Sequence, residues 1–172
     1  LLNVIFEQNG GIIAEEHLLE LVKNQTGTSA QPSLIIFYLD LMPLYQHNKG
    51  NQIFGPHWNH LNVHNQYTDK VILTAKEILE KSKQPLKEEE LIQKIREAIN
   101  VTKEVLADSC IYALLVASQE LQKTVFGEWG LANWVETSPR GVGDKAFIVL
   151  RRHGHPMHFR DITNQINEVK FD

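Results

Sequence analysis

The sequence contains a single cysteine, Cys110, so it can form neither an internal disulfide nor a cysteine-based zinc site. This scarcity favours a reducing, cytoplasmic setting. The sequence also lacks an apolar run long enough to span a membrane, since its most apolar stretch, residues 34–45, is interrupted by Asp40 and Pro43. It has no charged-then-apolar signal segment. The chain opens at Leu1 without Met, and we expect it to be a fragment of a longer protein.

Basic residues are scarce in the first part of the chain. The net charge is -4 and the isoelectric point is near 6.1, which argues against a strongly basic nucleic-acid binder. Residues 1–60 carry 2 basic and 5 acidic groups, and residues 61–134 carry 9 and 11. Residues 135–172 carry 6 and 5, so the only net positive region lies at the end. The composition, with 42% hydrophobic residues, is typical of a globular protein.

A weak internal repeat runs through the chain. The segments that begin near residues 10, 83 and 154 superimpose with offsets of 73 and 71 residues. Each has a short polar turn and then three apolar residues with the same spacing. Short helix-like segments, residues 2–9, 71–82 and 144–153, precede them, so each copy starts with a helix-turn-helix. The aligned apolar positions are Ile13, Leu86 and Met157, then Leu18, Leu91 and Ile162, then Val22, Ile95 and Ile166.

A third helix and a hairpin follow in the first two copies. Pro32 suits the first turn of a helix over residues 31–41, and Thr102 suits the N-cap of a helix over residues 103–115. Hairpins are expected over residues 44–55 and 114–127, each with a tryptophan after its end. Three helices with a two-stranded wing predict a mainly α fold with small β wings (α+β), built from tandem winged helix-turn-helix modules of which the third is truncated.

The repeat implies a definite division of the chain. We expect one winged-helix module over residues 1–60, a linker over 61–69 and a second module over 70–134. A joint over 135–143 then leads to the first two helices of an incomplete third domain over 144–172.

The last part of the chain resembles a known family. The string 144-DKAFIVLRRHGHPMHFRDITNQIN-167 is similar to the start of the HARE-type helix-turn-helix domain, found in the RNA polymerase delta subunit. The matching residues are Gly154, Pro156, Met157, Phe159, Ile162 and Ile166. The preceding residues, Trp129 to Ala146, resemble bacterial sigma-factor-like proteins that carry such domains. The resemblance covers residues 126–168 and implies a role in bacterial transcription, with contacts to DNA, to RNA polymerase, or to both.

The histidines are the first candidates for chemistry. His57, His60 and His64 would share one face of a helix and could hold a metal, but they lie in an Asn-rich segment that is typical of a linker, and no acidic or cysteine ligand completes the set. Cys110 falls within an apolar helix and is interpreted as a core residue. The sequence shows no nucleophile–base pair and no phosphate-binding loop. We therefore expect no catalytic residue, no metal and no cofactor.

Two surfaces are candidates for binding. Basic residues of the third copy could contact nucleic acid: Arg140, Lys145, Arg151, Arg152, His155 and Arg160. Apolar and aromatic residues of the first two copies could form a protein interface: Ile35, Phe37, Tyr38, Trp58, Trp129 and Trp134. The helix over residues 31–41 contains no basic residue, which makes it a poor reader of DNA.

The sequence predicts a non-enzymatic, transcription-related chain that binds duplex DNA, RNA polymerase or another transcription protein, and no membrane. One alternative is a protein-docking or self-associating array that does not bind DNA. A second is an accessory region of a DNA-processing enzyme whose catalytic domain lies elsewhere.

Overall fold

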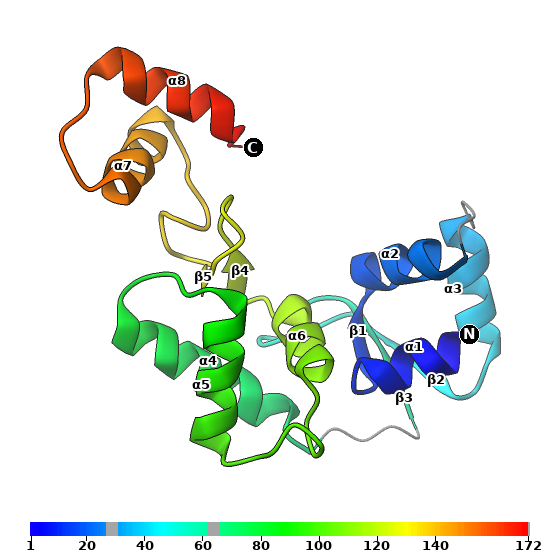
Figure 1. Ribbon diagram of the computed structural model, residues 1–172. Helices are drawn as coiled ribbons and strands as arrows, with labels where there is room; N and C mark the ends of the chain where they lie inside the picture. Colours follow the sequence, from blue (N-terminus) through cyan, green and yellow to red (C-terminus); the bar gives the residue numbers. More distant parts are fainter. Residues whose placement is uncertain (27–30, 62–65, 172) are drawn as a thin grey trace.

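The computed structural model describes residues 1–26, 31–61 and 66–171 (Figure 1). In these residues it contains eight helices and two small antiparallel sheets, one of three strands and one of two. The expected mainly helical α+β class is confirmed at this level. Within the described ranges, every helix is too short or too polar to cross a lipid bilayer.

The first unit, from α1 to β3, packs three helices on a three-stranded sheet. Its strands lie in the order β1-β3-β2, so the last strand pairs on both sides. Ile13 of β1 lies opposite Trp58 of β3, and Trp58 is 1% exposed. The apolar sides of the helices cover this pair and close one core. The elements are α1 (Leu2–Gln8), β1 (Ile12–Ala14), α2 (Glu15–Thr26), α3 (Pro32–Leu41), β2 (Tyr45–Asn48) and β3 (His57–His60).

The second unit, from α4 to β5, repeats this order with one difference. A single residue, Leu86, takes the place of β1 and pairs with Trp129 of β5 through two backbone hydrogen bonds of 2.7 and 2.9 Å. The sequence alignment that matched Ile13 with Leu86 thus places both residues opposite a buried tryptophan in the last strand. The elements are α4 (Thr68–Ser82), α5 (Glu88–Ile99), α6 (Asp108–Ala117), β4 (Leu121–Lys123) and β5 (Trp129–Leu131).

Both hairpins differ from the expectation in where their strands lie. The return strand of the first is residues 57–60, beyond the expected end at 55, and the second hairpin pairs 121–123 with 129–131. Trp58 and Trp129 therefore lie in the return strands and not after the hairpins. The sequence 57-HWNH-60 reads as a loop because of its polar residues, but pairing with β1 and β2 on either side makes it the central strand.

The third helix of the second unit begins later than expected. Its N-cap is Ala107, whereas Thr102 starts a turn in which its carbonyl oxygen accepts hydrogen bonds from the amides of Val105 and Leu106. The turn buries Leu106, which is 3% exposed, and Arg96 donates to the Leu106 carbonyl oxygen at 2.7 Å. Burial of this side chain outweighs the capping preference of Thr102.

The first two units interlock through the loop between β2 and β3. Phe54 pairs with Ser118 in an isolated bridge, and the amide of Gly55 donates to the carbonyl oxygen of Ala117 at 2.9 Å. The Gln119 amide donates to the Ile53 carbonyl oxygen at 2.8 Å. Phe54 is 3% exposed and belongs to the core of the second unit, not to that of the first. The two units thus share a core boundary.

The last two helices, α7 (Val142–His153) and α8 (Phe159–Val169), pack against each other as a pair. Figure 1 shows them connected to the second unit by the segment after β5. Gly154 ends α7 in a left-handed conformation with φ 78°, which glycine adopts without steric cost. The pair has a small core of Ile148, Val149 and Phe171.

Candidate functional site

The outer face of α3 exposes four large apolar side chains. Leu34, Phe37, Tyr38 and Leu41 are each at least half exposed, at 61%, 61%, 50% and 63%. Their spacing of three and four residues puts them on one side of the helix. We call these four residues the α3 face. Such a set of large apolar groups on one exposed helix side is typical of a surface that contacts another protein.

The α3 face is held outward because the other side of the same helix is fixed in the core. Ile35 and Leu39 are 9% and 0% exposed and pack among the buried residues of the first unit. Pro32 occupies the first turn, where its missing amide costs nothing. With the inner side fixed, the helix cannot rotate to bury its outer side as well.

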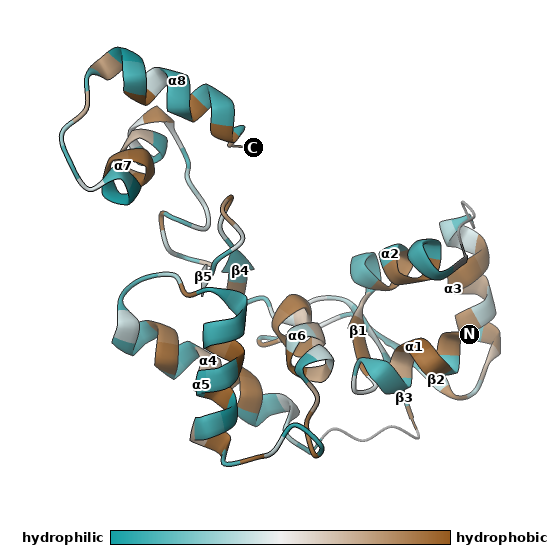
Figure 2. Ribbon diagram, in the orientation of Figure 1, coloured by the Kyte–Doolittle hydropathy of each residue, from teal (hydrophilic) through white to brown (hydrophobic). Residues whose placement is uncertain are grey.

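The chemistry of the α3 face is poorly suited to phosphate contacts. Helix α3 has no lysine or arginine, and Asp40 is its one charged residue. Figure 2 shows hydrophobic colouring over much of α3, which lies on the side of the first unit away from α6. Phosphate binding depends on lysine and arginine, so this surface suits an apolar partner.

Helix α6, the equivalent of α3 in the second unit, is covered by the first unit. The ring of Tyr112 meets the ring of His17 edge-on with centroids 5.6 Å apart. Ser109 donates a hydrogen bond to the carbonyl oxygen of Gln8, and β1 lies along the helix. On its other side, Ile111, Leu114 and Leu115 of α6 lie in the core of the second unit. No face of α6 comparable to the α3 face remains open.

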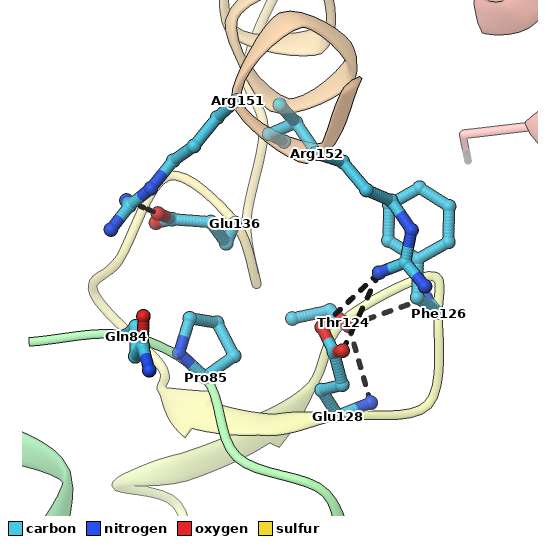
Figure 3. A pocket seen from close by; sticks show the side chains of 9 residues that line it. Gln84, Pro85, Thr124, Phe126, Glu128, Glu136, Arg151 and Arg152 are labelled. Atoms are coloured by element: carbon cyan, nitrogen blue, oxygen red, sulfur yellow. Dashed lines mark hydrogen bonds and ion pairs between the residues drawn. The ribbon is translucent and has the colours of Figure 1, made fainter. Parts of the chain in front are cut away.

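Two of the candidate nucleic-acid residues, Arg151 and Arg152, instead bind the second unit. Arg151 pairs with Glu136 and also donates to the Lys83 carbonyl oxygen at 3.3 Å. Arg152 pairs with Glu128 at 3.4 Å and stacks over the Phe126 ring, 3.9 Å from its centroid. Figure 3 shows Arg151 extending from α7 toward Glu136, in the segment after β5, and Arg152 extending toward Phe126 and Glu128. Both arginines line a cavity of about 280 Å³.

The other basic candidates are spread over the third part. Arg140, His155 and Arg160 are exposed, whereas Lys145 is half-buried and donates to the Phe171 carbonyl oxygen at 3.1 Å. The structure therefore does not gather the six candidates into one patch. Arg140 precedes α7 and Arg160 lies in the first turn of α8.

Several candidate interface residues do not reach the surface. Ile35, Trp58 and Trp129 are core residues, because at these positions of the helix and the strands the side chain points into the core. Trp134 is half-buried against the second unit. Of the six, Phe37 and Tyr38 present an exposed apolar side, and Leu34 and Leu41, which were not among the six candidates, extend it. Their helical spacing with Phe37 and Tyr38 was the signal that could have found them.

The histidines give no metal site in the described part of the chain, where no group of three or more possible ligands occurs. His57 and His60 lie in strand β3, three residues apart, so their side chains point to opposite faces. These two histidines therefore lie neither on a shared helix face nor in the linker that the Asn-rich sequence suggested. The Nδ1 atom of His57 lies 2.7 Å from the Gly55 carbonyl oxygen. His64 lies outside the described residues.

Cys110 lies at the contact between the first two units, half-buried and not fully in the core as expected. Its Sγ atom lies 3.8 Å from the carbonyl oxygen of Gln8. Burial raises the pKa of this thiol above its usual value, which keeps it protonated and a poor nucleophile at neutral pH.

Comparison with known proteins finds no matching family model, curated protein or solved structure. The geometry of the described residues is therefore the basis for any functional assignment.

Proposed function

We propose that this chain is a non-enzymatic protein-docking region of a transcription protein, built from tandem winged-helix modules with a third copy represented by its first two helices. It docks on RNA polymerase or another transcription protein through the α3 face. The observation that carries the proposal is the difference in exposure between the two equivalent helices, α3 and α6. The outer side of α6 is covered by the first unit, whereas the outer side of α3 is exposed, apolar and without a basic residue.

The arrangement of elements supports the winged-helix assignment. Each of the first two units has a helix, an extended residue or strand, two helices and two strands, with the first extended position beside the last strand. In DNA-binding members of such folds the third helix enters the major groove. Here the loop of the first wing is paired with residues 117–119, so it too is engaged within the chain.

A binding experiment with purified RNA polymerase tests the proposal. The double variant Phe37→Ser, Tyr38→Ser should lose binding in biolayer interferometry. Leu73→Ser is the matched control, because Leu73 is 52% exposed but lies on α4 of the second unit. Retained binding by the double variant, with both proteins folded by circular dichroism, would contradict docking through α3.

Contact with duplex DNA through the third part is a second candidate, favoured by the exposed Arg140 and Arg160. A fluorescence-anisotropy titration at low salt separates the two. DNA affinity that drops steeply with salt and disappears in Arg140→Gln, Arg160→Gln would support it. If no DNA binding is measurable at low salt, protein docking remains as the function of this region.

A further inference from the structure

We propose that the partner of the α3 face is an amphipathic helix with an apolar stripe flanked by lysine or arginine. This inference rests on the proposed docking function and names the chemistry of its partner.

The shape of the α3 face favours a helix as its partner. Leu34 and Leu41 lie seven residues apart, and Phe37 and Tyr38 lie between them, so the face is a ridge about two turns long. Side-chain ridges of one helix fit the grooves between side chains of another. A partner helix with apolar residues at the same spacing can cover the whole ridge.

The negative charge around the α3 face favours a partner helix with basic residues beside its apolar stripe. Residues 1–60 contain 5 acidic and 2 basic groups, so the first unit is net negative. Asp40 is exposed on α3 itself, between the positions of Phe37 and Leu41. Lysine or arginine beside the partner's apolar stripe would meet these carboxylates.

A second copy of the chain fits the ridge less well. A two-fold contact through the α3 face would place the same surface of two chains against each other. The same contact would bring two acidic units and two copies of Asp40 together, and like charges across an interface oppose association.

The test uses two synthetic helical peptides of about 16 residues and the full chain. Both peptides carry leucines at the spacing of the α3 face, but one has lysine at the flanking positions and the other glutamate. In fluorescence anisotropy at low salt, the lysine peptide should bind at least about tenfold more tightly, and added salt should narrow the difference. Phe37→Ser should abolish binding, and Asp40→Asn should reduce the preference for lysine.

Equal binding of the two peptides, or tighter binding of the glutamate peptide, would overturn the inference. So would dimerisation of the chain in sedimentation that Phe37→Ser abolishes, because a second copy would then occupy the face. Polymerase binding that depends on Phe37 and Tyr38 without any preference between the peptides would remove the inference and leave the docking function in place. Leu73→Ser should behave as the unaltered chain in every assay, since its side chain is exposed elsewhere.

Discussion

Replacement of Phe54 by alanine should destabilise both of the first two units together. Phe54 is 3% exposed and lies in the core of the second unit, although it belongs to the loop between β2 and β3 of the first. A buried phenylalanine removes about 200 Å² from water, which corresponds to about 5 kcal/mol. Measured phenylalanine-to-alanine losses in cores are about 3–5 kcal/mol, and we expect a value in that range.

Urea unfolding followed by circular dichroism measures this loss as a change in the free energy of unfolding. The unaltered chain should unfold the first two units in one transition, because Phe54 and the backbone bonds around Ser118 join them. Phe37→Ala is the matched control: its ring is 61% exposed, so the change should stay within about 0.5 kcal/mol. A loss below about 1 kcal/mol for Phe54→Ala would refute the shared core.

Three further predictions concern charge and backbone. A hydrogen bond from Lys103 lowers the pKa of Asp108 in the folded chain. The stability that the Asp108 carboxylate contributes is therefore present above the unfolded pKa of about 3.9 and is lost as the pH falls through the lower folded pKa. In urea titrations Asp108→Asn should unfold more easily than the unaltered chain at pH 6, and the difference in unfolding free energy should shrink in acid. Arg152→Gln breaks a half-exposed ion pair, so stability should fall by less than about 1 kcal/mol, while hydrogen exchange in α7 should accelerate. Gly50→Ala should cost more than about 1 kcal/mol in thermal unfolding, because φ is +97° and the new Cβ would lie 2.8 Å from a backbone oxygen. Gly141→Ala should cost less, because its new Cβ meets no atom within 4 Å and only the N-cap preference of α7 is weakened.

Local patterns predicted most of the helices. The alternation of apolar and charged residues located α4 and α5, and the Gly154–Pro156 turn separated α7 from α8. The repeat that matched Ile13 with Leu86 was informative because both residues pair with a tryptophan in the last strand of their unit. Where side-chain periodicity and burial agree, the sequence is sufficient.

Long-range pairing was not predictable in the same way. Strand β3 consists of His57, Trp58, Asn59 and His60, whose strand identity depends on two neighbouring strands and not on propensity. For the candidate site, the absence of basic residues in α3 was visible in the sequence, and so were Phe37 and Tyr38. The coverage of α6 was not, because it depends on how two units meet across residues distant in the chain.

The position of Phe54 has a consequence for how such a chain can change over generations. By order along the gene this residue belongs to the first repeat, and by packing it belongs to the second. A recombination event that exchanged one repeat alone would leave one core without a ring and expose that ring elsewhere. An exchange that preserves both cores must therefore carry the two repeats together, with Phe54 still packed in the second unit.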